Sequence, residues 1–312
     1  MSSARLVAIE VALIGAALAV VLSVLLARLV WASSSEPTIG IALRQVSSSG
    51  KPCRLAADGE PLTKAQILSY YGNPYAADMG IVGELPPDAL VEKLKAHAQR
   101  YNSLNGSRSV QPALHLVYAT AQKEPGPEGL HLTYVGKETL QEYLDLACEH
   151  GLLVFLDLQI GRSDVETELA KILPYLEQPH VHVALDPEYA VAEGQIPCEN
   201  LGSLDAADVN AAQAVLQNFL EERNLPNKIL IVHQFSRDML TRPELIEDYP
   251  RVKFVIDMDG IGPPDIKRAT YHRLTASAEY AGIKLFFHLD EPNHLMSEQE
   301  VLQLKPDVII YQ

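Results

Sequence analysis

Side chains that can exchange protons gather at the ends of several apolar runs in this sequence. The runs that read FLDLQIGR, ALDPE, VHQ, IDMDG and FHLDE each finish in acidic, histidine or amide residues. Carboxyl and imidazole groups are the usual general acids, general bases and nucleophiles of enzymes. The candidates from these five runs are Asp157, Gln159, Arg162, Asp186, Glu188, His233, Gln234, Asp257, Asp259, His288, Asp290 and Glu291.

The spacing of these residues predicts that they share faces. Residues two apart on a strand point to the same side. Carboxylates that converge on one site repel one another, so some must be protonated, paired with a histidine or with Arg162, or bound to a cation. The pairs with this spacing are Asp157 with Gln159, Asp186 with Glu188, Asp257 with Asp259, and His288 with Asp290.

Short apolar runs alternate with amphipathic segments over the rest of the chain, a pattern typical of parallel sheets with helical crossovers. We expect strands at 67–71, 114–119, 152–158, 181–185, 228–233, 253–257, 284–288 and 307–311. We expect helices at 87–102, 137–149, 164–177, 206–223, 242–248, 264–281 and 298–304. Capping-box patterns that begin at Ser163, Thr241 and Ser297 mark three helix starts, and Gly151 and Gly282 mark two helix ends.

Eight strands in about 250 residues predict a (β/α)8 barrel of the TIM type. A doubly wound sheet is the alternative, although the sequence has no G-x-G-x-x-G turn. The sequence reaches Gln312 directly after the eighth strand, so we expect the usual eighth helix to be missing. Part of the segment 39–64 is expected to cover the gap.

The N-terminal residues predict a membrane signal. Residues 11–27 are uncharged and apolar, and Trp31 follows them. An uncleaved anchor is favoured over a cleavable signal peptide, whose cleavage pattern would lie near Ala32. We therefore expect a signal segment at 1–32, a tether at 33–64 and the barrel at 65–312. The protein would sit in the cell membrane through a single N-terminal span with an extracytoplasmic domain, or be secreted if cleaved.

Composition narrows the partners. Lys and Arg total 25 and Asp and Glu total 40, a net charge of −15 that argues against nucleic acid as a partner. The three cysteines match no zinc motif, and we expect three free or buried thiols, with a Cys53–Cys198 bond as the alternative. His182 and Lys284 are expected to be structural, and His115 an ordinary strand-end residue.

The active site of such a barrel lies at the carboxyl ends of its strands. There Glu188 would be a general acid tuned by Asp186, and the second carboxylate would be Asp290 or Asp259. This hypothesis needs no cofactor and no metal, and its ligand would be a carbohydrate or another hydroxyl-rich molecule. Besides the candidates named above, the expected substrate-binding residues are Tyr71, Asn73, Tyr118 and Tyr311.

The run Asp186-Pro-Glu188 resembles the end of the chitinase-type motif D-x-x-D-x-D-x-E, whose last Glu is the proton donor. Val181 and Ala184 replace its earlier aspartates. The positions of Glu188 and Glu291 (or Asp290) are also similar to those of the carboxylates in the largest clan of barrel glycosidases, with Pro187 in place of the clan's Asn. The resemblance implies a glycoside hydrolase-like barrel.

Two other functions remain open from the sequence. A metal-dependent hydrolase could use Asp157, Asp186, Asp257, His233 and His288 as ligands, although no H-E-x-x-H is present. A barrel can also lose catalysis and keep its cleft, which would make the protein an extracytoplasmic glycan- or peptide-binding module.

Overall fold

The structure is a computed structural model that describes Cys53 and residues 61–290 and 294–312. The chain divides into two compact units, 1–44 and 45–312, and every described residue belongs to the second. The predicted anchor, nearly all of the tether, and Glu291 lie outside the described residues. Within the described part, no helix is both long and apolar enough to cross a membrane.

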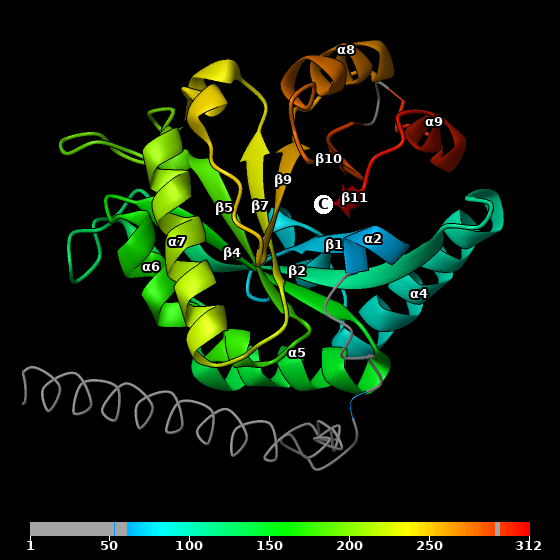
Figure 1. Cartoon of the computed structure of the whole chain (residues 1–312), viewed down its shortest axis with the longest axis horizontal. Helices are drawn as coiled ribbons and strands as arrows, with labels where there is room; N and C mark the ends of the chain where they lie inside the picture. Colours follow the sequence, from blue (N-terminus) through cyan, green and yellow to red (C-terminus); the bar gives the residue numbers. More distant parts are fainter. Residues whose placement is uncertain (1–52, 54–60, 291–293) are drawn as a thin grey trace, which may run out of the picture. The chain divides into compact units, whose positions relative to one another are not determined.

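The fold is a closed parallel barrel, as predicted (Figure 1). Its strands are β1 (Ala65–Gly72), β2 (Ser109–Ala121), β4 (Leu153–Gly161), β5 (Val181–Ala190), β7 (Lys228–Gln234), β9 (Val252–Met258), β10 (Tyr280–Leu285) and β11 (Val308–Tyr311). Each strand pairs in parallel with the next, and β1 pairs with both β2 and β11, which closes the ring. Short strands add to the outside: β3 (Leu132–Tyr134) runs antiparallel to β2, and β6 (Leu204–Asp205) pairs with β8 (Leu240–Thr241).

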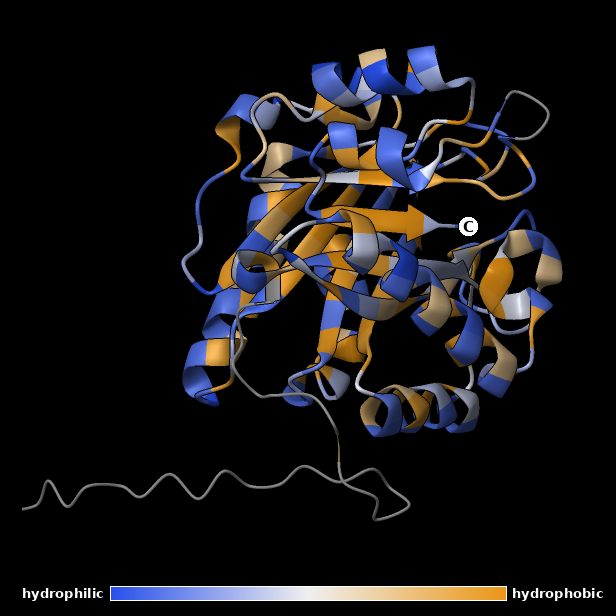
Figure 2. Ribbon diagram, turned by 90° about the vertical axis from the view of Figure 1, so that its right-hand side faces the viewer, coloured by the Kyte–Doolittle hydropathy of each residue, from blue (hydrophilic) through white to orange (hydrophobic). Residues whose placement is uncertain are grey.

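Helices cover the outside of the strands, and α4, α5, α6 and α7 surround one side of the barrel in Figure 1. The α-helices are α2 (Pro61–Lys64), α3 (Ile81–Glu84), α4 (Pro87–Leu104), α5 (Lys137–His150), α6 (Val165–Ile172), α7 (Ala206–Glu222), α8 (Pro264–Leu274) and α9 (Glu298–Gln303). Short 3-10 helices lie at Ala77–Met79, Tyr175–Glu177, Arg237–Met239 and Pro243–Leu245. The helices are amphipathic and the strands mostly apolar, as the colours of Figure 2 show.

Two buried layers follow from the alternation of side chains along the strands. Outward residues such as Leu156 and Leu230 pack with the helices, whereas inward residues such as Ile67, Leu153 and Ile229 fill the barrel. The inward residues are apolar toward the amino ends of the strands and polar toward the carboxyl ends, where Asp157 and Asp257 are fully buried. The polar half of the barrel interior therefore lies next to a layer of apolar side chains that includes Ile67, Leu153 and Ile229, which we call the apolar floor.

The seventh barrel strand lies earlier in the chain than predicted. It covers Tyr280–Leu285 rather than 284–288, and the preceding helix ends at Leu274 rather than at 281. Gly282 is a strand residue and not a helix stop. A Cβ atom on Gly282 would lie 2.5 Å from Oδ1 of Asp257 on β9, so glycine makes room for this carboxylate.

Other local predictions were corrected at helix ends. The segment 242–248 contains only the 3-10 turn Pro243–Leu245. The capping box at Ser297 forms, but Thr241 caps no helix and α6 is capped by Asp164 rather than by Ser163. Pro174 comes two residues after Ile172, the last residue of α6, which explains why the expected helix 164–177 stops there.

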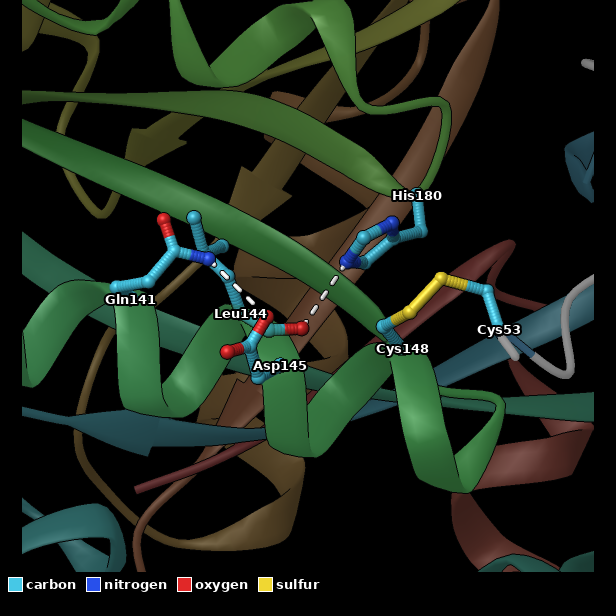
Figure 3. Close-up of a disulfide and its surroundings, with 6 residues drawn as sticks. All are labelled: Cys53, Gln141, Leu144, Asp145, Cys148 and His180. Atoms are coloured by element: carbon cyan, nitrogen blue, oxygen red, sulfur yellow. Dashed lines mark hydrogen bonds between the residues drawn. A yellow bond between two sulfur atoms is a disulfide. The ribbon is translucent and has the colours of Figure 1, made fainter. Parts of the chain in front are cut away.

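The cysteine prediction was wrong, because Cys53 forms a disulfide with Cys148 of α5 (Figure 3). Their Cα atoms are 4.5 Å apart, within the range that a disulfide spans. His180 lies next to this bond and its Nε2 is 3.3 Å from the carbonyl oxygen of Leu144. Cys198 is a free, exposed thiol.

Part of the predicted gap-covering segment is described. It forms α2, whose Leu62 is buried with the apolar residues that fill the barrel interior. The disulfide ties Cys53, eight residues before α2, to the outer helix α5. The remainder of 39–64 lies outside the described residues, so its relation to the eighth-helix position stays a prediction.

Candidate active site

A cavity of about 650 Å³ opens at the carboxyl ends of the barrel strands. Asp186 and Glu188 from β5 and Asp259 after β9 line it, as do Gln159 from β4 and Tyr71 from β1. The rest of the lining includes Lys284 and the apolar or aromatic residues Tyr189, Phe235, Met258, Ile266, Phe286 and Leu289. We call this cavity the pocket.

Three carboxyl groups that line the pocket, those of Asp186, Glu188 and Asp259, hold their protons more tightly than usual. Burial and the neighbouring charge of Asp157 raise the pKa of Asp186 well above its ordinary value. Burial raises the pKa of Asp259, although Lys284 and His233 oppose it. Burial and the nearby Asp259 also raise the pKa of the half-buried Glu188. The pocket can therefore present a protonated carboxyl group where a surface carboxyl would be ionised.

Lys284 supplies a buried positive charge in the wall of the pocket. Its side chain is 4% exposed, and Nζ stands 3.6 Å from the centre of the Tyr71 ring and 5.4 Å from that of Phe286. Among the described residues, no carboxylate oxygen lies within ion-pair distance of this ammonium group. Lys284 is thus held by aromatic faces and is available to a negative charge in the pocket.

A buried cluster of histidines and aspartates lies next to the pocket. His233 Nδ1 is 3.0 Å from Oδ2 of Asp257, and His233 Nε2 is 3.5 Å from Oδ2 of Asp157. His115 Nε2 is 3.5 Å from the same Asp157 oxygen and 3.4 Å from His233 Nε2. All four side chains have no exposed surface. Tyr71 connects the cluster to the pocket, because its ring packs on His115 with 5.0 Å between ring centres.

The charges in this cluster depend on one another. Burial would raise the pKa of Asp157, but His233 and His115 hold it well below its usual range. Burial would lower the pKa of His233, but Asp157 and Asp257 raise it well above its usual range. Burial lowers the pKa of His115 to about 4. The cluster without an ion therefore contains ionised Asp157, protonated His233 and neutral His115.

Three of these side chains are also placed where they could hold a metal ion together. One donor atom from each of His115, Asp157 and His233 lies within 4.8 Å of the other two. The predicted metal ligands Asp157, Asp257 and His233 are in or beside this group, but His288 is not. His288 is exposed, and its Nε2 lies 2.9 Å from Oε1 of Glu84.

Asp290, a predicted catalytic residue, is bound into the scaffold. Its Oδ2 is 3.1 Å from Nζ of Lys267 and accepts a hydrogen bond from the Phe286 amide, and its Oδ1 accepts one from the Gly262 amide. Lys267 also donates to the carbonyl oxygens of Gly260 and Lys284. This buried pair joins the loops after β9 and β10, so Asp259 is the better second carboxyl group.

Several predicted binding residues lie away from the pocket. Tyr311 packs outside the barrel, where its hydroxyl is 2.8 Å from that of Tyr101. Tyr118 contacts the rings of Tyr134 and Tyr175. Asn73 donates hydrogen bonds to the Val117 carbonyl and the Thr120 hydroxyl. Arg162 donates one to the Gln195 carbonyl. Gln234 points to the face of β7 opposite His233.

His115 and Lys284 were missed by sequence reasoning. His115 alternates with Ala113 and Val117, both of which face the barrel interior, so a longer β2 would have predicted it inward. Lys284 is the next-to-last residue of β10. The sequence interpretation began the strand at Lys284, which moved the apparent strand end to His288.

Comparisons with known proteins identify no family. No family model matches the chain, and neither does any curated protein. Among solved structures, 2,3-dimethylmalate lyase of the PEP mutase/isocitrate lyase superfamily aligns over 81% of this chain and 77% of its own, with 10% identity and a TM-score of 0.45.

Two further solved structures align with similarly low sequence identity. A triazine hydrolase from Arthobacter aurescens covers 80% of this chain and 59% of its own at 12% identity and a TM-score of 0.35. A Rhizobium etli pyruvate carboxylase covers 81% and 23% at 9% identity and a TM-score of 0.38. The barrel fold rests on the strand order of this chain, and no function is taken from these similarities.

Proposed function

We propose that this protein is a hydrolase that acts on a carbohydrate or another hydroxyl-rich substrate in the pocket, with Glu188 as general acid. The observation that carries the proposal is the meeting of Glu188 and Asp259 on one cavity in which burial raises the pKa of both carboxyl groups. Glycoside hydrolysis requires such a pair, one carboxyl protonated and the other ionised.

The surroundings assign the two roles. Glu188 is half-buried and closer to solvent than Asp259, so it can regain its proton between turnovers. Asp259 is 6% exposed, and the charge of Lys284 is the strongest influence that favours its ionised form. When one member of a close carboxyl pair is ionised, repulsion keeps the proton on the other. Glu188 would protonate the leaving group while Asp259 acts as base or nucleophile.

The walls of the pocket suit a ring-shaped polar substrate. Tyr189, Phe235 and Phe286 present apolar rings, on which the C–H face of a sugar can pack. Carboxyl and ammonium groups nearby can exchange hydrogen bonds with hydroxyl groups. A volume of about 650 Å³ falls within the range of small-molecule sites.

The test is a screen of chromogenic glycosides and soluble glycans with the wild type, followed by Glu188→Gln. Loss of the general acid should reduce turnover about 10²–10⁴-fold without altering the circular dichroism spectrum. Asp78→Asn is the matched control, because Asp78 is an exposed carboxylate that lines the same pocket. Equal activity of Glu188→Gln and the wild type would refute the role of Glu188, and no turnover of any glycoside would refute the substrate class.

A metal-dependent hydrolase is the second candidate function. The observation that favours it is the close approach of His115, Asp157 and His233 next to the pocket. Export of the domain remains part of the proposal, and the Cys53–Cys148 disulfide supports it because disulfides persist mainly in oxidising compartments.

A further inference from the structure

Three donor atoms converge inside the barrel next to the pocket. The distances between His115 Nε2, His233 Nε2 and Asp157 Oδ2 are 3.4, 3.5 and 3.5 Å. These atoms form a nearly equilateral triangle whose centre is about 2.0 Å from each corner, and zinc binds histidine nitrogen and carboxylate oxygen at about 2.0–2.2 Å. A single ion near the centre would therefore reach all three ligands without movement of the chain.

The size of the triangle also indicates a coordination geometry. Ligands about 2.1 Å from a metal lie about 3.4 Å apart when the site is tetrahedral. They lie about 3.0 Å apart when they occupy one face of an octahedron, as in the iron sites built from two histidines and one carboxylate. The observed 3.4–3.5 Å matches the tetrahedral arrangement.

The hydrogen bonds around the cluster leave the metal-facing atoms free. Both carboxylate oxygens of Asp157 are buried and have no hydrogen-bond partner among the described residues. His233 directs Nδ1 toward Asp257 at 3.0 Å, which leaves Nε2 pointing at the triangle. A carboxylate behind a ligating histidine is a common arrangement in zinc sites, since it fixes the ring orientation and makes the nitrogen more basic.

A cluster without metal accounts for less of this geometry. A protonated His233 between Asp157 and Asp257 would form a good hydrogen bond with Asp257, but its distance of 3.5 Å from Asp157 is too long for one. It would also leave His115 Nε2 facing His233 Nε2 at 3.4 Å. One bound cation satisfies all three atoms together.

We propose that His115, Asp157 and His233 bind one zinc-type divalent ion in a tetrahedral site, with Asp257 as the carboxylate that orients His233. The fourth ligand position belongs to a water molecule or to Asp186, whose Oδ1 is buried without a partner and whose side chain lines the pocket. This places the ion between the apolar floor and the proposed catalytic carboxyl groups. The site uses neither Glu188 nor Asp259, so it does not depend on the roles proposed for those two residues, and it specifies the ion that the second candidate function would use.

The experiment measures metal in the full-length protein, purified from zinc-supplemented medium. We expect about one zinc ion per chain by mass spectrometry. Removing it with a chelator should lower Tm by at least about 5 °C, and added Zn²⁺ should restore it. Replacement with Co²⁺ should produce the intense visible absorption of tetrahedral cobalt. A wild type that holds no metal and whose Tm responds to neither chelator nor Zn²⁺ would overturn the proposal.

Variants locate the site. Asp157→Asn keeps the side-chain shape but should lose the metal and the response to chelator. His97→Gln is the matched control, since His97 is a buried histidine in the layer outside the barrel, 3.1 Å from the Tyr70 hydroxyl, and should keep the metal. Glu188→Gln should also keep it, which separates this proposal from the proposed function. Full metal retention by Asp157→Asn, or equal loss from His97→Gln, would place the ion elsewhere and refute the assignment.

Discussion

Gly282→Ala tests the arrangement of the buried cluster without removing any of its polar groups. The new Cβ atom would lie 2.5 Å from Oδ1 of Asp257, 3.0 Å from its Cβ and 3.1 Å from its Cα. Carbon atoms in ordinary contact are about 3.5–4.0 Å apart, so the Asp257 side chain must move. That movement pulls Oδ2 away from His233 Nδ1, which it now holds at 3.0 Å.

The expected cost has two parts. Overpacking of a tight interior costs about 1–3 kcal/mol. Weakening a charge-assisted hydrogen bond costs up to about 1.5–3 kcal/mol more. Replacing a strand glycine with alanine by itself stabilises the folded state by about 0.5–1 kcal/mol, which offsets part of this cost. We expect the free energy of unfolding to fall by about 2–4 kcal/mol, which lowers Tm by roughly 4–8 °C for a domain of this size. Calorimetry and urea unfolding measure both quantities.

A double-mutant cycle shows whether the cost arises at Asp257. In an Asp257→Ala background the contact with Oδ1 is gone and the contacts with Cβ and Cα at 3.0 and 3.1 Å remain, so Gly282→Ala should cost at least about 1 kcal/mol less than in the wild type. Gly260→Ala is the control, because the nearest atoms to its Cβ are side-chain atoms of Phe235 and Met258 at 3.3 and 3.6 Å. Equal costs of Gly282→Ala in the two backgrounds, or a stability within 0.5 kcal/mol of wild type, would refute the reasoning.

Three further predictions concern other parts of the barrel. Asp290→Asn should lower the free energy of unfolding by about 3–5 kcal/mol, measured by urea unfolding, because it leaves the Lys267 ammonium buried without its ion pair; a loss below 1 kcal/mol would contradict this. Cys148→Ser should lower it by about 2–5 kcal/mol through loss of the bond to Cys53, and reductant should lower Tm of the wild type but not of the variant. The kcat/KM of an active substrate should fall as pH rises through the pKa of Glu188, because the general acid must be protonated. Burial raises this pKa above its ordinary value of 4.5, so the fall in kcat/KM should be centred above pH 4.5. A fall centred at or below pH 4.5 would contradict the assignment.

The barrel was predictable because its signals are local. Apolar runs alternating with amphipathic segments predicted eight parallel strands, all of which form. The seventh strand shows the limit of this approach. A run of alternating or apolar residues indicates that a strand is present. Gly282 was interpreted as a helix end because the residue that requires a glycine there, Asp257, lies on another strand.

The candidate site was predictable only in its outline. Two-residue spacing correctly predicted that Asp186 and Glu188 share a face, and both line the pocket. It could not show that Lys267 neutralises Asp290, since Lys267 lies in α8 and Asp290 in the loop after β10, and their pairing is a tertiary contact. Nor could it show Cys53 beside Cys148, which are 95 residues apart.

By itself, the sequence determined the order of strands and helices and the end of the barrel at which polar residues gather, because both follow from the period of side chains along the chain. Only the tertiary structure decided which of those polar residues act together. Closing the ring of strands brings His115 from β2, Asp157 from β4 and His233 from β7 to one point. It also carries Tyr311 to the outer layer. Such meetings depend on the stagger and curvature of strands distant in sequence, and no local pattern encodes them.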